Sequence, residues 1–192
     1  MKLVSEVRRL TGIPGTDACV RPHMSTHVIF EGTPGVYAET GSVIVEGAHL
    51  ADVVDAARRA AVDAETIELC GAVPVEVAAE VIRSVGDAAE VRVNRYGFES
   101  LEAAAAYKAA FSTGGDPGDA AFFFLAEAPT EITQRDGVIV AGVADMSDLR
   151  DRAAQALKLG AGIVELYGGL GVVAAAEVRA ATKSRLPVGY ID

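Results

Sequence analysis

The sequence is poor in the residues that several classes of protein need. It has no tryptophan, and only 6% of its 192 residues are aromatic, so it lacks the stacking surfaces typical of proteins that bind single-stranded nucleic acid. Lys and Arg number 17 against 27 Asp and Glu, a formal net charge of -10. That charge repels a phosphate backbone and an anionic membrane surface. We therefore expect neither nucleic acid nor a membrane as a partner.

Cysteine and long apolar runs are also scarce. The two cysteines, Cys19 and Cys70, do not make a disulfide framework. The first ten residues lack the apolar core of a signal peptide, and charged residues interrupt every stretch long enough to span a membrane. These absences predict a cytoplasmic protein. Its content of hydrophobic residues, 51%, is sufficient for the core of one domain or two.

The chain repeats itself at an offset of 97 residues. Residues 67–71 (IELCG) resemble residues 164–168 (VELYG), and residues 56–93 share 12 identities in 38 ungapped positions with residues 153–190. Further upstream, residues 43–47 match residues 138–142 at an offset of 95. We predict a tandem duplication with repeats over residues 27–94 and 120–192. The alternative, two similar units without a common ancestor, gives the same local structure.

Each repeat has the pattern strand, strand, helix, strand, helix, strand. Apolar and β-branched runs predict the strands, and apolar stripes at helical spacing predict the helices. The predicted strands cover residues 27–30, 42–45, 65–70, 90–94, 121–125, 138–143, 162–167 and 186–191, and the predicted helices cover 50–60, 75–85, 147–159 and 172–182. We expect an α/β fold of two ββαβαβ repeats, with parallel strand pairing and a pseudo-twofold axis. Two sheets, one continuous sheet and a barrel all remain open.

Two segments lie outside the repeats. Residues 1–26 are predicted to hold a short polar helix and a turn-rich stretch. Residues 95–119 connect the repeats through a helix over 100–111, followed by a linker rich in Gly, Pro and Asp. We expect this helix to cover a sheet face, with a lid over a pocket or an oligomer contact as alternatives. One side of it carries Leu101, Ala104, Ala105, Lys108 and Phe111.

The segment GIVELYGGLG at residues 162–171 resembles a family of short, uncharacterised bacterial proteins. Those proteins carry an E-L-C-G-G-F-G segment before a helix and a final P-V-G strand, which corresponds here to residues 187–189. Cys70 matches the family cysteine in the first repeat, whereas Tyr167 replaces it in the second. The resemblance covers most of residues 120–192 and, more weakly, residues 27–94. It implies a fold but no activity, because none is established for the family.

Two glutamates occupy equivalent positions in predicted strands. Glu68 and Glu165 interrupt apolar runs that should be buried, and a buried carboxyl group needs a partner or its pKa rises. Sites in α/β proteins form at the carboxyl ends of strands. We therefore take both glutamates as candidate catalytic acids or bases, with Tyr167 and Cys70 as adjacent catalytic candidates. The alternatives are a structural carboxylate that binds backbone N–H groups or an arginine, and an inert buried cysteine.

Glycines and arginines are the candidate ligand-binding residues. Gly168, Gly169 and Gly171 lie between a strand and a helix, where free backbone N–H groups can bind an anion or a carbonyl oxygen. A tight turn is the alternative for this segment. Arg92 and Arg95 lie in and after the last strand of the first repeat, where they can neutralise an acidic substrate or the buried glutamate of that repeat. A salt bridge between the repeats is their alternative role.

Metal and cofactor motifs are weak in this chain. Cys19, His23 and His27 recur at intervals of four, but Pro22 disfavours the helix that would align them. No P-loop lysine or G-x-G-x-x-G spacing follows a strand, so we predict no metal and no cofactor. Our hypothesis is acid–base chemistry of the isomerase, cyclase or lyase type on a small metabolite. The alternative is a non-catalytic small-ligand-binding protein or oligomeric scaffold, so whether the chain is an enzyme stays open.

Overall fold

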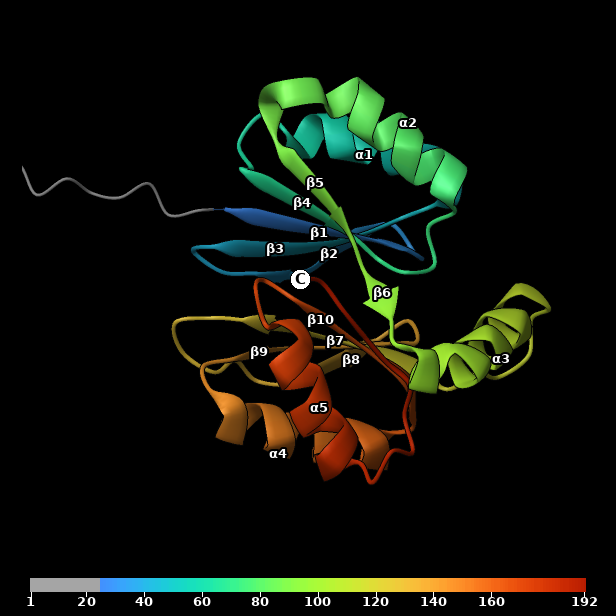
Figure 1. The fold of residues 1–192 in the computed structure, drawn as a ribbon. Coiled ribbons are helices and arrows are strands. Elements are labelled where there is room, and N and C mark those ends of the chain that lie inside the picture. Colours follow the sequence, from blue (N-terminus) through green and yellow to red (C-terminus); the bar gives the residue numbers. More distant parts are fainter. Residues whose placement is uncertain (1–24) are drawn as a thin grey trace, which may run out of the picture.

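The computed structural model describes residues 25–192, which form two mostly parallel β-sheets and five α-helices. Figure 1 shows four layers, with α1 and α2 above the first sheet and α4 and α5 below the second. The predicted polar helix near the amino terminus, Cys19 and His23 lie outside the described residues. Within the described part, no helix is long and apolar enough to cross a membrane.

The first sheet has the strand order β2-β3-β1-β4-β5. Strand β1 pairs in parallel with β3 and β4, β4 pairs in parallel with β5, and β2 runs antiparallel to β3. The strands are β1 (Thr26–Glu31), β2 (Gly35–Glu39), β3 (Val43–Ala48), β4 (Thr66–Leu69) and β5 (Glu90–Val93). The helices are α1 (Val53–Ala60) and α2 (Val75–Val85), with short 3-10 turns at Leu50–Asp52 and Gly86–Ala88.

The second sheet has the order β6-β11-β10-β7-β9-β8, with parallel pairing from β11 to β9 and antiparallel strands at both edges. The strands are β6 (Arg95–Tyr96), β7 (Asp119–Leu125), β8 (Thr133–Arg135), β9 (Val138–Val143), β10 (Ala161–Tyr167) and β11 (Val188–Tyr190). The helices are α3 (Leu101–Ser112), α4 (Met146–Leu159) and α5 (Gly171–Ala181), with a 3-10 turn at Phe98–Ser100. The described chain therefore forms two sheets, neither continuous with the other.

The sequence-based prediction missed the antiparallel strands at the sheet edges. Strands β2 and β8 are largely exposed, and every residue of β8 is open to solvent. A strand without a buried face has no apolar alternation to reveal it. Helix α4 begins one residue before its predicted start, and Asp145 caps it by accepting hydrogen bonds from the backbone N–H groups of Ser147 and Asp148. The helix ends at Leu159 as predicted, and Gly160 after it has a left-handed conformation that stops the helix.

One hydrophobic core lies between the two sheets and joins both parts of the chain. The ring of Phe30 on β1 lies 4.8 Å from that of Phe122 on β7, which in turn lies 5.9 Å from Tyr167 on β10. Alanine-rich faces let α1 and α2 pack closely on the outer side of the first sheet. A second cluster fills the space between the other sheet and α4 and α5. The two sheets therefore share this core.

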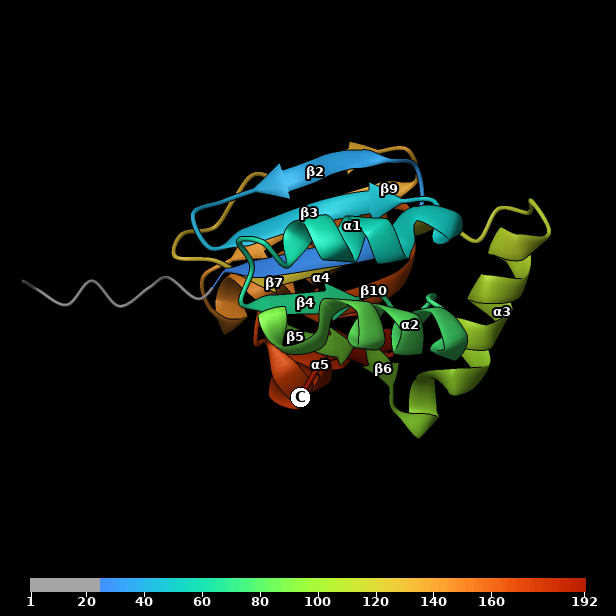
Figure 2. The ribbon, with the colours of Figure 1, turned by 90° about the horizontal axis from the view of Figure 1, so that it is seen from above.

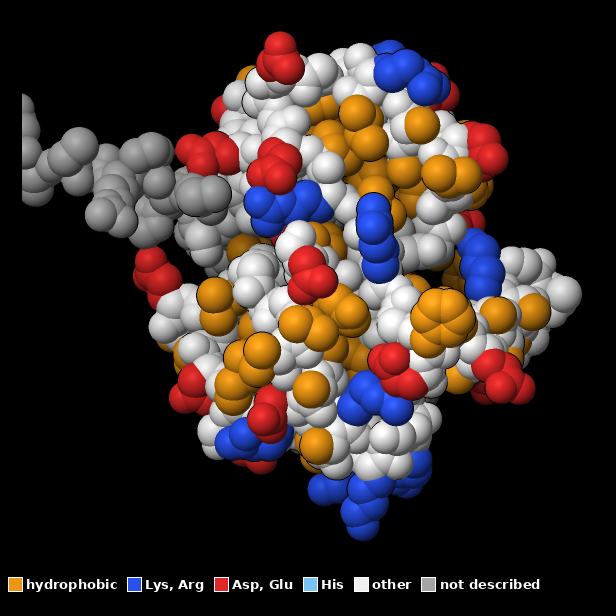
Figure 3. Space-filling model, in the orientation of Figure 1, with side chains coloured by type: hydrophobic (Ala, Val, Ile, Leu, Met, Phe, Trp, Pro, Cys, Tyr) orange, Lys and Arg blue, Asp and Glu red, His pale blue; other side chains and the backbone are white. Residues whose placement is uncertain are grey.

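Helix α3 stands apart from these layers, as Figure 2 shows. None of its residues is buried. Further apolar side chains reach the surface over α2 and α5, where orange patches mark them in Figure 3. They include Val75, Ile82, Val172 and Val173.

Candidate functional site

The two buried glutamates bind backbone groups reciprocally across the sheets. Glu68 lies in β4 and accepts a hydrogen bond at Oε2 from the N–H of Gly168, at 2.7 Å. Glu165 lies in β10 and accepts one at Oε1 from the N–H of Gly71, at 3.0 Å. Glu68 is only 1% exposed and Glu165 only 3%. Each carboxyl group thus fixes the loop that follows the other glutamate's strand.

Glu165 has hydroxyl groups around it rather than cations. The hydroxyl of Tyr96 donates to its Oε1, and that of Tyr167 donates to its Oε2. Burial raises the pKa of the Glu165 carboxyl, and the hydrogen bonds from Tyr167, Tyr96 and Gly71 lower it in part. The net direction is upward because burial is the largest of these effects, and no ion pair among residues 25–192 offsets it. Tyr96 follows β5 and was not among the residues selected from the sequence.

Glu68 has a basic residue on the neighbouring strand. Arg92 stands opposite Glu68 in the parallel register of β4 and β5, and its guanidinium forms an ion pair with Glu90 at 2.7 Å. Burial raises the pKa of Glu68, while the Gly168 N–H and the charge of Arg92 lower it in part. Arg95 is exposed on β6.

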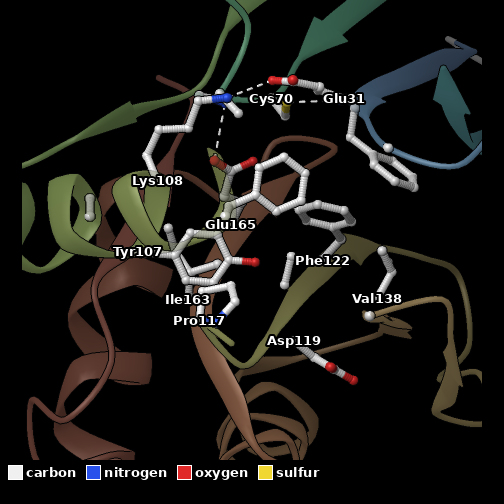
Figure 4. Close-up of a pocket in the computed structure, with 18 of the residues that line it drawn as sticks. Glu31, Cys70, Tyr107, Lys108, Pro117, Asp119, Phe122, Val138, Ile163 and Glu165 are labelled. Atoms are coloured by element: carbon white, nitrogen blue, oxygen red, sulfur yellow. Dashed lines mark hydrogen bonds and ion pairs between the residues drawn. The ribbon is translucent and has the colours of Figure 1, made fainter. Parts of the chain in front are cut away.

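A cavity of about 770 Å³ lies beside Glu165. It is bordered by the carboxyl ends of β1 and β4, the amino ends of β7 and β9, and helix α3 (Figure 4). The whole face of α3 noted in the sequence borders it, namely Leu101, Ala104, Ala105, Lys108 and Phe111. Helix α3 therefore covers this space instead of a sheet face.

Of the predicted catalytic residues, Glu165 and Cys70 border the cavity, whereas Glu68 and Tyr167 do not. Cys70 follows β4, is 2% exposed, and its Sγ accepts a hydrogen bond from the backbone N–H of Glu31 at 3.4 Å. Burial raises the pKa of the Cys70 thiol to about 12. A thiol with so high a pKa stays protonated at neutral pH and is a weak nucleophile.

Tyr107 is a second tyrosine that the sequence did not single out. It lies on α3, and its hydroxyl points into the cavity toward the centre of Figure 4. Burial raises its pKa to about 12, so the hydroxyl keeps its proton. It has no hydrogen-bond partner among the described residues, which leaves it available to a ligand. The sequence feature that could have identified Tyr107 is its position one residue before Lys108, on the helix face that lines the cavity.

An ion pair closes one side of the cavity. The Nζ of Lys108 on α3 lies 2.7 Å from a carboxylate oxygen of Glu31 at the end of β1. The same Nζ lies 5.4 Å from the ring centre of Phe111. This pair connects the helix to the first sheet.

The predicted glycine loop does not reach the cavity. Gly168, Gly169 and Gly171 all have positive φ angles, of 64°, 87° and 64°, as a tight turn between β10 and α5 requires. The N–H of Gly168 is already bound by Glu68. Neither these glycines nor the arginines Arg92 and Arg95 border the cavity, whereas Gly71 does.

Comparison with known proteins finds similarity in the carboxyl-terminal part of the chain. The model of a family of unknown function, DUF6506, matches residues 123–192. The resemblance of this part of the chain to uncharacterised proteins is thereby confirmed. No curated protein matches the sequence.

Proposed function

We propose that this protein binds a small molecule in the cavity beside Glu165. Support comes from the volume of about 770 Å³, which is in the range of small-molecule sites. The lining is also typical of such sites, since apolar rings and alanines surround a few polar groups. The single observation that carries the proposal is the juxtaposition of this cavity with the Tyr107 hydroxyl and the Glu165 carboxyl.

The lining suggests how a ligand would be held. Phe30 and Phe122 offer ring surface on the side of the sheets, and the alanines of α3 offer a flat apolar surface opposite them. A polar group buried there needs a hydrogen-bond partner, and the Tyr107 hydroxyl can donate or accept. We infer a ligand with an apolar body and one polar group near Tyr107 and Glu165.

Acid–base catalysis is the second candidate function, favoured by the state of Glu165. A carboxyl group with a raised pKa keeps its proton to a higher pH than an exposed one, so it can act as a general acid and, once ionised, as a stronger base. In this proposal Glu165 exchanges a proton with the ligand, while Tyr96, Tyr167 and the Gly71 N–H hold its oxygens in place. Isomerase, cyclase or lyase chemistry needs no more than such a group. Glu68, which does not border the cavity, would be structural.

We also infer that the two halves arose by tandem duplication and are related by a pseudo-twofold axis. The offset of 97 residues places Glu68 on Glu165 and Gly71 on Gly168, the four residues of the reciprocal hydrogen bonds. The order β2-β3-β1-β4-β5 also recurs as β8-β9-β7-β10-β11. In that case each half is a βββαβαβ unit, with one antiparallel strand more than the sequence predicted.

A pair of matched variants tests ligand binding. A metabolite screen by thermal shift would first identify ligands, because binding to the native state raises its apparent stability. Ala105→Trp fills the cavity, whereas Ala106→Trp changes an exposed neighbour on α3 that does not border it. We expect ligands found in the screen to lose their effect with Ala105→Trp and keep it with Ala106→Trp. Ligands that still bind the Ala105→Trp variant equally well would contradict the proposal.

Proton exchange tests the catalytic alternative. With a bound ligand in deuterated water, Glu165 should promote exchange of a ligand C–H, which NMR can follow. We expect Glu165→Gln to abolish this exchange and Glu68→Gln to retain it. A wild-type protein that binds the ligand without exchange or turnover would leave binding as the function and reject catalysis.

A further inference from the structure

The charged groups around the cavity are strongly unbalanced. Five carboxyl groups border it, whereas the ammonium of Lys108 is the one Lys or Arg group that does so among the described residues. His49 also borders it and is formally neutral at pH 7. The five carboxyl groups belong to Glu31, Asp116, Asp119, Asp136 and Glu165.

Two of these carboxyl groups have cationic partners. Glu31 pairs with Lys108 at 2.7 Å, and Asp136 pairs with Arg135, which does not border the cavity, at 3.4 Å. These pairs leave no cation of the cavity wall free to meet an anionic ligand. A carboxylate or phosphate entering the cavity would meet Lys108 only in competition with the carboxylate of Glu31.

The other three carboxyl groups have only neutral partners among residues 25–192. Asp116 accepts a hydrogen bond from the N–H of Gly118 at 3.0 Å, and Asp119 accepts one from Gln134 at 2.7 Å. Glu165 accepts from tyrosine hydroxyls and a backbone N–H. Negative potential is stronger in a cleft with apolar walls than over open surface, because such walls focus the field.

Aromatic rings provide a second attraction for a cation. Phe30, Tyr96, Tyr107 and Phe122 all border the cavity, and the face of an aromatic ring attracts a cation within about 6 Å of its centre. The rings also provide apolar surface for the rest of a ligand. Carboxyl groups at the rim and rings in the wall are the combination that recognises an organic cation.

We propose that this cavity takes an organic amine, a molecule with an apolar body and one ammonium group, and that it rejects carboxylates and phosphates of the same size. This inference rests on the proposed binding function and narrows its ligand class. The ammonium would lie near the Tyr107 hydroxyl, at the end of the cavity where Asp116 and Asp119 lie, with the apolar body under α3.

Three probes of the same shape, one positive, one neutral and one negative, test the inference. Naphthylmethylamine, naphthylmethanol and naphthoate share one apolar body, and a second trio built on a phenyl ring covers smaller ligands. Titrations followed by NMR would give the Kd of each probe at low and at physiological salt. We expect the amine to bind about tenfold more tightly than the alcohol, and the carboxylate about tenfold more weakly, with the difference reduced by salt.

Variants assign this preference to the cavity. Asp116→Asn with Asp119→Asn should bring the Kd of the amine close to that of the alcohol, whereas Asp151→Asn, an exposed change on α4, should leave the ratio unchanged. An alcohol that binds as tightly as the amine, or a carboxylate that binds more tightly, would overturn the amine assignment and leave the binding function intact. Failure of every probe to bind, or binding that Ala105→Trp does not reduce, would contradict the binding function itself.

Discussion

Glu68 and Glu165 make the same contact in two different surroundings. Each is buried in a central strand and accepts a hydrogen bond from the glycine N–H that follows the other's strand. Around Glu68 the structure is closed, with Arg92 on the next strand. Around Glu165 two tyrosine hydroxyls replace the arginine, and a cavity opens. The contact itself is therefore the same at both positions, whereas only Glu165 borders a cavity.

The segment between the repeats explains the difference. Tyr96 on β6 and the lining face of α3 both lie on the Gly71 side. On the other side, the space next to Gly168 is occupied by the backbone of Leu125, at 3.2 Å from the position of an added Cβ. A connection that adds an edge strand and a helix on one side only can thus convert one of two similar surroundings into a pocket.

Removing each carboxyl group should reveal the largest difference in stability between the two glutamate positions. Glu165→Ala leaves the buried Tyr167 hydroxyl, the partly buried Tyr96 hydroxyl and the Gly71 N–H without an acceptor, whereas Glu68→Ala leaves only the Gly168 N–H. An unsatisfied buried donor costs about 1–3 kcal/mol. We expect Glu165→Ala to lower the free energy of unfolding by about 4 kcal/mol and Glu68→Ala by about 2 kcal/mol. Urea denaturation measures both, and equal losses would show that the tyrosines do not depend on Glu165.

The two glycines should respond to alanine in different ways. A Cβ on Gly71 would lie 2.6 Å from the Tyr96 ring and 2.9 Å from the Glu165 carboxylate, so Gly71→Ala should disturb the cavity and cost about 1–3 kcal/mol. Gly168→Ala places alanine at a φ of 64°, which costs about 1 kcal/mol or more but leaves the cavity intact. Thermal shift with a ligand of the cavity distinguishes the two variants, because only Gly71→Ala should reduce the shift. Ligand binding that survives Gly71→Ala would place the ligand elsewhere.

The pH dependence of stability should separate the glutamates further. Both have a pKa raised above the ordinary 4.5 in the folded state, so the native protein binds more protons than the unfolded chain. Their contribution is present at low pH and is lost as the pH rises through the raised values. We expect Glu165→Gln and Glu68→Gln to flatten this decline, Glu165→Gln more, because no cation balances its charge. Denaturation between about pH 5 and 8 measures it, and a variant curve parallel to the wild-type curve would contradict the prediction.

The smallest effect on stability is expected at the ion pair of the cavity. Lys108 is 41% exposed in its side chain, and partly exposed ion pairs contribute less than about 1 kcal/mol. Lys108→Met should therefore leave the melting temperature almost unchanged, as should the control Lys158→Met on α4. It should nevertheless strengthen the binding of an amine, because it removes the ammonium from the cavity wall. Weaker amine binding in this variant would count against the cavity's preference for cations.

The local sequence determined the elements with a buried face. Apolar β-branched runs marked the central strands of both sheets, and Gly160 marked the end of α4, because these signals act between residues a few positions apart. The repeat also placed Glu68 and Glu165 in equivalent strands. The exposed edge strands β2 and β8 escaped notice, since solvent on their side chains leaves no pattern in the sequence.

The tertiary structure alone decided what the two glutamates contact and where a pocket lies. Glu165 and Gly71 are 94 residues apart, and Lys108 and Glu31 are 77 apart, so no local spacing predicts these contacts. The sequence directed attention to the glycines after β10, whereas the cavity formed beside Gly71, Tyr96 and α3. The physical reason is that a strand pattern records burial but not which distant group satisfies a buried charge. That choice depends on how two sheets and a connecting helix pack together.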